Sequence, residues 1–177
     1  KLAVVHSDDT IVILPDDVFA PLVPCGRIVL GGARETAEAF VGHPLGASVE
    51  VVLPGRLERR PGEVRDGAHN PDGIAWLCER LPAGDYTVCA SILADKDVDE
   101  MLRRLSGLGA RFVATQSSNT RSLAAPALAE RARGHFPLVE EIADPAAAVR
   151  RAHARGEPVL VVGSLYLLAD LEAAEGP

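Results

Sequence analysis

Asp66-Gly67-Ala68-His69-Asn70-Pro71-Asp72-Gly73 is the stretch of sequence that indicates the fold. Asn70 can cap a helix with its side-chain oxygen, and Pro71 suits the first helical position because the N–H of that residue would have no partner. A helix is therefore expected to begin here, after an incoming strand. Asp66 and His69 would then lie on the turn between strand and helix, where open α/β sheets bind ligands. The alternative is a capped turn with a surface Asp and His.

Strand and helix alternate from Arg56 to the end of the sequence. A tight hairpin is expected over residues 57–65, with Pro61-Gly62 as its turn, followed by a helix from Asn70 to Leu81. Further strands are expected over residues 86–92, 110–115, 138–142 and 158–162, and further helices over residues 98–106, 124–133, 145–155 and 165–174. This alternation predicts an α/β fold with a parallel sheet buried on both faces.

The loops that follow the predicted strands carry polar and charged side chains. The carboxyl ends of parallel strands share one edge of the sheet, so the loops at 66–70, 93–97, 116–122 and 163–164 are expected to open there. This places five candidate binding residues around one crevice: Asp66, His69, Lys96, Arg121 and Ser164.

Each of these residue types suits a particular ligand group. A carboxylate at a strand end, such as Asp66, accepts hydrogen bonds from ribose hydroxyls. Lys96 offers a point charge to a carboxylate or phosphate, and Arg121 can clamp a carboxylate through its guanidinium. Ser164 can present its hydroxyl and backbone N–H groups to an anion. The alternatives are a helix-start carboxylate, a solvated lysine, a surface ion pair and a plain helix cap. Together these residues describe a crevice for a nucleotide and a small dicarboxylate.

Composition argues against several other classes of protein. The net charge is −7 and the aromatic residues are scattered, so a nucleic-acid-binding face is not expected. Apolar residues make up 47% of the sequence, but no run approaches the roughly 20 residues that cross a membrane. Cys25, Cys78 and Cys89 are widely spaced and are expected to be buried and reduced, as in a cytoplasmic protein.

The first 52 residues form a separate, smaller piece. Apolar runs predict strands over residues 2–5, 10–14, 27–30 and 47–53, and residues 15–23 and 31–41 are expected to be helical. About fifty residues bury too little surface for an independent core. The whole sequence also lacks a G-x-G-x-x-G motif, a phosphate loop and an H-E-x-x-H motif, which favours half of a nucleotide site over a complete one.

Four separated motifs coincide with one known family. They are Leu53-Pro54-Gly55-Arg56-Leu57-Glu58, Asp66-Gly67-Ala68-His69-Asn70-Pro71, Leu93-Ala94-Asp95-Lys96-Asp97 and Gly163-Ser164-Leu165-Tyr166. In order and spacing they resemble the C-terminal domain of folylpolyglutamate synthase/dihydrofolate synthase, of the Mur ligase superfamily. The resemblance covers Leu53 to the end of the sequence. It implies a Rossmann-like α/β fold with a mostly parallel sheet and an early antiparallel strand.

The resemblance also implies roles for individual residues. Arg56, Asp66 and Asn70 would contact ATP, and His69 and Lys96 would take part in catalysis. The glutamate side of the site would be formed by His69, Lys96, Arg121, Ser164 and Tyr166.

The assignment of Arg121 rests on a second similarity. Residues 118–122, Ser-Asn-Thr-Arg-Ser, resemble the Asp-Asn-Pro-Arg amino-acid-binding loop of the related peptidoglycan ligases. Ser118 and Thr120 stand in place of the Asp and the Pro.

The implied chemistry is ATP-dependent ligation in folate biosynthesis and one-carbon metabolism. MgATP would phosphorylate a carboxylate of folate or dihydropteroate, and the amine of L-glutamate would attack the acyl phosphate, giving an amide and ADP. The cofactors implied are ATP and Mg²⁺, and metal and lysine charge would stabilise phosphoryl transfer.

The sequence departs from the family pattern at its start. The phosphate loop and most of the central ATPase domain are missing, so residues 1–52 are interpreted as the tail of that domain and residues 53–177 as the glutamate ligase domain. Lys1–Val5 resembles a family segment whose lysine can be carbamylated near magnesium, which makes Lys1 a metal-site candidate only if carbamylated. Without the N-terminal ATPase domain as partner, the chain is expected not to turn over ATP.

Two other functions remain open from the sequence. One is a noncatalytic nucleotide- or anion-binding α/β module that has lost its ATPase partner. The other, a hydrolase built on Asp66 and His69, lacks a nucleophile placed by any motif.

Overall fold

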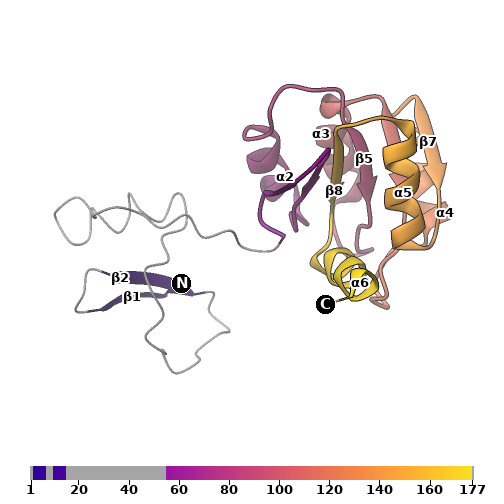
Figure 1. Ribbon diagram of the computed structural model, residues 1–177. Coiled ribbons are helices and arrows are strands. Elements are labelled where there is room, and N and C mark those ends of the chain that lie inside the picture. The colour runs from indigo at the N-terminus through magenta and orange to yellow at the C-terminus, as the bar shows by residue number, and fades with distance from the viewer. Residues whose placement is uncertain (1, 7–9, 15–54, 177) are drawn as a thin grey trace. The chain divides into compact units, whose positions relative to one another are not determined.

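The chain separates into two units, residues 1–52 and 53–177. The computed structural model describes residues 2–6 and 10–14 of the first unit and residues 55–176 of the second. In the first unit, β1 (Leu2–His6) and β2 (Thr10–Leu14) pair antiparallel, and both strands were predicted there (Figure 1). The elements predicted over residues 15–53, together with Lys1 and Cys25, lie outside the described residues.

The second unit is built on a six-stranded sheet in the order β3-β4-β8-β5-β6-β7. Its strands are β3 (Glu58–Arg60), β4 (Glu63–Arg65), β5 (Thr87–Ala90), β6 (Arg111–Ala114), β7 (Leu138–Glu141) and β8 (Val159–Val162). β3 pairs antiparallel with β4 across the turn at Pro61-Gly62, and every other pair in the sheet is parallel. The expected hairpin and the mostly parallel sheet are both confirmed.

Helices link the parallel strands and cover both faces of the sheet (Figure 1). They are α2 (Pro71–Cys78), α3 (Val98–Leu105), the 3₁₀ turn η1 (Ser106–Leu108), α4 (Ala125–Ala132), α5 (Pro145–Arg155) and α6 (Leu165–Glu175). Buried side chains of α2, α3 and α4 belong to one core cluster, and those of α5 and α6 belong to a second.

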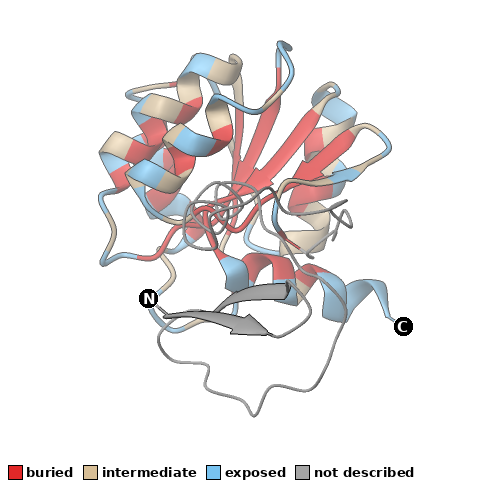
Figure 2. Ribbon diagram, turned by 90° about the vertical axis from the view of Figure 1, so that its left-hand side faces the viewer, coloured by how far each residue is buried: buried red, intermediate tan, exposed pale blue. Residues whose placement is uncertain are grey.

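The strands between these two clusters are apolar on both faces. In β5, Val88 and Ala90 belong to the first cluster and Cys89 to the second, because successive side chains of a strand point to opposite faces. All three are fully buried, and Figure 2 shows the same burial along the neighbouring strands. Burial raises the pKa of the Cys89 thiol to about 12, so Cys89 packs as an uncharged apolar residue, as predicted.

Asn70 begins α2 as predicted, since its side-chain oxygen Oδ1 accepts the N–H of Gly73 at 2.7 Å. The helix ends at Cys78, however, and not at Leu81. The N–H groups of Arg80 and Leu81 both donate to the carbonyl of Leu77, so the predicted last residues form a terminal turn that satisfies this carbonyl.

Trp76, the single tryptophan of the sequence, lies on α2 and remains 45% exposed. The guanidinium carbon of Arg80 lies 4.1 Å from the centre of its ring. This is a cation–π contact at the surface, so the indole is ordered by a neighbouring charge and not by the core.

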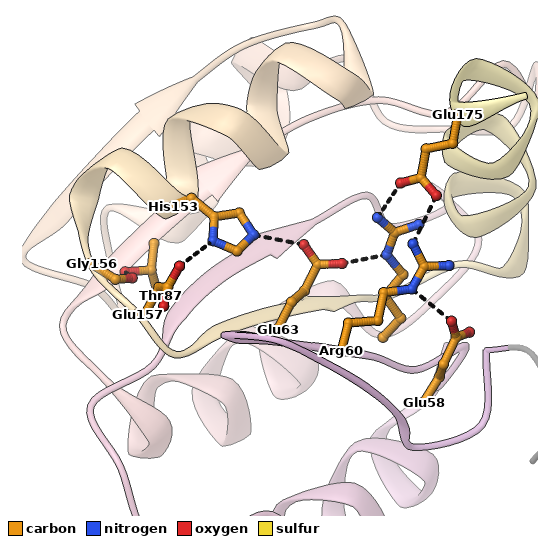
Figure 3. Close-up of polar contacts among 9 residues, drawn as sticks. Glu58, Arg60, Glu63, Thr87, His153, Gly156, Glu157 and Glu175 are labelled. Carbon is orange, nitrogen blue, oxygen red and sulfur yellow. Dashed lines mark hydrogen bonds and ion pairs between the residues drawn. The ribbon is translucent and has the colours of Figure 1, made fainter.

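A chain of alternating charges joins the β3–β4 hairpin to α5 and α6 (Figure 3). Glu63 on β4 accepts hydrogen bonds from Arg65 and from Nε2 of His153 on α5, the latter at 2.8 Å. Arg65 and Arg60 both donate to Glu175 in the last turn of α6. The side chains of Glu63 and Arg65 are each only 5% exposed, so this ion pair lies in the protein interior, where each charge needs a partner.

The charges in this chain shift the pKa values of its members. His153 also approaches Glu157, whose carboxylate is 2.9 Å from Nδ1. Burial by itself lowers the pKa of His153, but hydrogen bonds to Glu63 and Glu157 and their charges raise it above its ordinary value. Hydrogen bonds from Arg65 and Arg60 lower the pKa of Glu175. Both shifts favour the charged forms.

Replacing His153 by Gln should reduce stability more at low pH than at high pH. A pKa that folding raises contributes stability that is fully present below the unfolded value of about 6.5 and is lost as pH rises through the folded value. We expect the difference in Tm between wild type and His153→Gln, measured by circular dichroism, to be largest below about pH 6.5 and to shrink as the pH rises above this value. His135→Gln is the control, because Nε2 of His135 lies 3.9 Å from Oδ1 of Asp99, which is too far for a hydrogen bond. A Tm difference that does not change with pH contradicts the prediction.

Arg65 and Arg60 should differ in their importance for stability although both bond Glu175. Arg65→Ala leaves Glu63 buried without its arginine, which should cost about 3 kcal/mol of the free energy of unfolding. Arg60 is more exposed, so Arg60→Ala should cost about 1 kcal/mol or less. Urea unfolding measures both losses in the free energy of unfolding, and equal losses would contradict a larger contribution of the buried ion pair to stability.

Candidate functional site

The carboxyl ends of four neighbouring parallel strands, β4, β8, β5 and β6, form one edge of the sheet. Backbone hydrogen bonds join the loops that follow them. Gly163 N–H donates to the Ala68 carbonyl at 3.0 Å, and Ala94 N–H donates to the Arg121 carbonyl at 2.8 Å. The predicted convergence of the loops at 66–70, 93–97, 116–122 and 163–164 on one edge is therefore confirmed.

Asp66 holds the start of this edge together. Its carboxylate is 2% exposed; Oδ2 accepts the N–H of Leu57 at 2.7 Å and Oδ1 accepts the N–H of Ala68 at 2.8 Å. Gly67 N–H also donates to the Gly55 carbonyl at 2.8 Å. Asp66 thus fixes the turn at residues 55–57 against the loop that begins α2.

Arg56 lies at the centre of that turn. Its neighbours Gly55 and Leu57 both have left-handed backbones, with φ of 69° and 47°. This conformation is costly for a leucine, and the hydrogen bond from Leu57 to Asp66 stabilises it. Arg56 itself is exposed, so its guanidinium can meet a ligand from solvent.

The start of α6 packs closely against the end of β5. Gly163 has a φ of 103°, and a Cβ atom at this position would lie 2.6 Å from the carbonyl oxygen of Ser91. Only glycine therefore fits there. Ser164 follows and is only 1% exposed. Its hydroxyl oxygen accepts the N–H of Tyr166 at 3.1 Å, so Ser164 caps α6, which was the alternative given for this residue. Tyr166 is 44% exposed.

The ring of His69 has a fixed tautomer. Nδ1 lies 2.8 Å from the carbonyl oxygen of Gly67, and a carbonyl only accepts hydrogen bonds, so Nδ1 carries a proton. In the neutral ring, Nε2 is then the acceptor. His69 is partly exposed, and it is oriented by its own loop.

Lys96 and Arg121 share one carboxylate that was not predicted as part of the site. Lys96 Nζ is 3.4 Å and Arg121 Nη1 is 3.6 Å from Oδ2 of Asp95. Desolvation raises the pKa of Asp95, but a backbone hydrogen bond and the two cations outweigh it and lower the pKa overall. Both distances exceed those of good charged hydrogen bonds, and two cations face one anion. Neither cation is therefore held tightly by Asp95, and both are available to an anionic ligand.

The structure brings the predicted residues into two groups along one edge. Direct contacts link Asp66 to the turn of Arg56, whereas Lys96 and Arg121 meet at Asp95. The sequence signal for Asp95 was its position beside Lys96 in a quoted motif.

A second unpredicted residue, Asp170 on α6, bonds Ser118 in the loop of Arg121. Asp170 lies inside a helix and carries no motif, so no sequence signal pointed to it.

The described residues contain neither a metal-binding cluster nor a membrane-spanning helix. Among residues 2–6, 10–14 and 55–176, no group of three or more His, Cys, Asp or Glu side chains is arranged to hold a metal ion. In the same part of the chain, no helix combines the length and apolar character needed to span a bilayer.

Comparisons with known proteins agree with this geometry. The chain is 39% identical over 129 residues to the probable bifunctional folylpolyglutamate synthase/dihydropteroate synthase of Haloferax volcanii, covering 66% of this chain and 15% of that protein. It is 35% identical over 121 residues to the folylpolyglutamate synthase of Lacticaseibacillus casei, covering 64% of this chain and 28% of that protein.

Solved structures give the same result for the fold. Mycobacterium tuberculosis folylpolyglutamate synthase complexed with ADP and AMPPCP matches with a TM-score of 0.71 and 26% identity, over 82% of this chain and 38% of that one. E. coli FolC in complex with DHPP and ADP matches with a TM-score of 0.66 and 25% identity, over 83% of this chain and 39% of that one. This chain therefore spans well under half the length of these proteins.

The model of a protein family matches the part of the chain that forms the sheet and its loops. That model is the Mur ligase glutamate ligase domain, and it covers residues 55–165. The match includes more than half of the chain and all four predicted loops. The chain therefore belongs to the Mur ligase family, through its glutamate ligase domain.

Proposed function

We propose that this chain is the C-terminal portion of an ATP-dependent ligase that joins L-glutamate to folate or dihydropteroate. The observation that carries the proposal is the convergence of the four predicted loops on one edge of the sheet, with the loosely paired cations Lys96 and Arg121 beside it. The similar proteins named folylpolyglutamate synthase support the choice of substrate. Because this chain spans only part of their length, the remainder of the active site is assigned to an N-terminal ATPase domain.

We assign the residues of the edge to two sides of the site. Arg56, Asp66 and Asn70 form the nucleotide side, where exposed Arg56 meets the ligand and buried Asp66 holds the turn that presents it. The glutamate side comprises His69, Lys96, Arg121, Ser164 and Tyr166.

In the proposed reaction, a carboxylate oxygen of the folate or dihydropteroate attacks the γ-phosphorus of ATP, which releases ADP. The amine of L-glutamate then attacks the acyl carbon, the C–O bond to phosphate breaks, and an amide and inorganic phosphate form. Lys96 and Arg121 hold carboxylate and phosphate oxygens, and positioning of this kind supplies most of the catalysis in phosphoryl transfer. Nε2 of His69 accepts the proton that the amine loses.

Magnesium would neutralise phosphate charge in such a ligase. No cluster of three or more His, Cys, Asp or Glu side chains that could hold a metal ion lies among the described residues, and we assign its protein ligands to the ATPase domain. Residues 1–52 are proposed to be the tail of that domain. Lys1 is proposed as a magnesium ligand only if it is carbamylated.

Turnover of ATP by the isolated chain tests the proposed function. The purified chain with ATP, dihydropteroate and glutamate should release no ADP, because the phosphate-loop domain is missing. Addition of the N-terminal ATPase half of a related ligase should restore ADP release that depends on glutamate, measured by a coupled assay. Nucleotide binding by the chain without any restored turnover would instead favour a noncatalytic nucleotide-binding module.

In the restored enzyme, Lys96→Ala should lower kcat by about 100-fold, since removal of a preorganised donor to developing charge has this order of effect. Arg103→Ala is the matched control: Arg103 is exposed on α3, and within residues 55–176 its guanidinium pairs only with Glu100 of its own helix. An equal effect of the two substitutions would exclude Lys96 from the site.

Asp66→Asn tests the nucleotide side. Each oxygen of Asp66 accepts a backbone N–H, so an amide NH₂ group must face one of these donors and leave it unpaired. We expect a loss of about 2 kcal/mol in the free energy of unfolding and faster amide exchange at Leu57. The affinity for AMPPCP, measured by calorimetry, should also fall. Asp72→Asn, on the exposed first turn of α2, is the control. Unchanged exchange at Leu57 would contradict the role given to Asp66.

A further inference from the structure

The loop that carries Arg121 is attached to the rest of the edge at three places. The first attachment is at its base, where Ser117 N–H donates to the hydroxyl oxygens of Ser91 at 2.9 Å and Ser122 at 3.1 Å. The two hydroxyl groups are themselves 3.0 Å apart. These contacts fix both ends of the loop to the end of β5.

The second attachment joins the loop to its neighbour. The carbonyl of Arg121 accepts the N–H of Ala94, and the N–H of Arg121 donates to Oδ1 of Asn119 at 2.9 Å. The backbone of Arg121 is therefore held on the side of Lys96, where the two cations share Asp95.

The third attachment is to α6. Oδ2 of Asp170 accepts the N–H of Ser118, and Oδ1 accepts the Ser118 hydroxyl, each at 2.7 Å. These are short, charge-assisted hydrogen bonds that use both oxygens of one carboxylate. Asp170 makes no ion pair within residues 55–176, so its charge is directed to the loop and not to Arg121.

The position of Asp170 on α6 connects this attachment with the start of the helix. Residues four apart lie on the same side of an α-helix, so Asp170 and Tyr166 lie on the same side of α6, one turn apart. The loop of Arg121 is thus held against the side of α6 that carries Tyr166. The distance between Arg121 and the N-terminal end of α6, where Ser164 caps the helix, depends on this contact.

We infer that Asp170 is a positioning residue: it sets the spacing between the loop of Arg121 and the start of α6, and so the width of the glutamate side of the site. This inference rests on the proposed function. Asp170 does not touch the ligand. It acts through Ser118, while Asp95 and Ala94 hold the opposite side of the loop.

The test compares Asp170→Ala, Asp170→Asn and Ser118→Ala with Glu172→Gln, a control that removes an exposed acidic charge from the same helix. Amide exchange by NMR on the 177-residue chain reports the contact directly. Titrations with L-glutamate and with AMPPCP report the two sides of the site separately. Asp170 is partly exposed, so all variants are expected to fold, and circular dichroism confirms this.

Asp170→Ala should raise the exchange rate of the Ser118 amide and weaken L-glutamate binding, each by about ten-fold, with AMPPCP affinity unchanged. Asp170→Asn retains one acceptor and Ser118→Ala retains the backbone hydrogen bond, so both should lie between Asp170→Ala and wild type. Glu172→Gln should match wild type.

Two results would overturn the inference, and they differ in their meaning. If wild type binds L-glutamate and Asp170→Ala binds it equally well, Asp170 does not position the loop, and the proposed function stands. If wild type shows no response to L-glutamate, the proposed glutamate site fails and the positioning role fails with it.

Discussion

Parallel pairing of β4, β8, β5 and β6 is the constraint on which the rest of the structure depends. Parallel neighbours require a crossover for each strand, so helices cover both faces and the strand interiors are apolar. Polar side chains are then concentrated where the strands end. The buried polar residues Asp66, Ser91, Ser117 and Ser164 all lie within three residues of the carboxyl end of a strand. The geometry that builds the core therefore also assembles the candidate site.

Glu63 and Arg65 on β4 place two charged side chains in the interior of the second unit. Val64 faces the larger core cluster, so its neighbours Glu63 and Arg65 must face the opposite side, beneath α5 and α6. They are buried as an ion pair whose remaining bonds extend to His153 and Glu175. Removing one partner of a buried ion pair is costly, because the other charge is left buried without compensation. In this chain they fix the last turn of α6, while Ser164 and Gly163 fix its first.

Much of this organisation could be predicted because it is local. The pattern of apolar residues located β5 to β8 and α2 to α6, the Pro61-Gly62 turn located the β3–β4 hairpin, and Asn70 marked the start of α2 by its capping chemistry. The predicted end of α2 at Leu81 was wrong, since the helix ends at Cys78 and a terminal turn follows it. The contact of Asp170 with Ser118 and that of Arg65 with Glu175 could not be predicted. They join residues 52 and 110 positions apart, and no spacing rule relates them. The topology brought the loops together, but it did not determine which side chains meet.

The stacked indole on α2 gives the molecule a built-in spectroscopic reporter. Because Trp76 is the only tryptophan of the sequence, selective excitation of indole fluorescence isolates one helix without any label. Its ring is half in water and half against the Arg80 guanidinium, so its emission is sensitive to small changes in solvation and in nearby charge. The same short helix begins at Asn70, on the nucleotide side. A shift of its emission maximum on addition of a nucleotide would be an optical readout of occupancy in the unmodified chain.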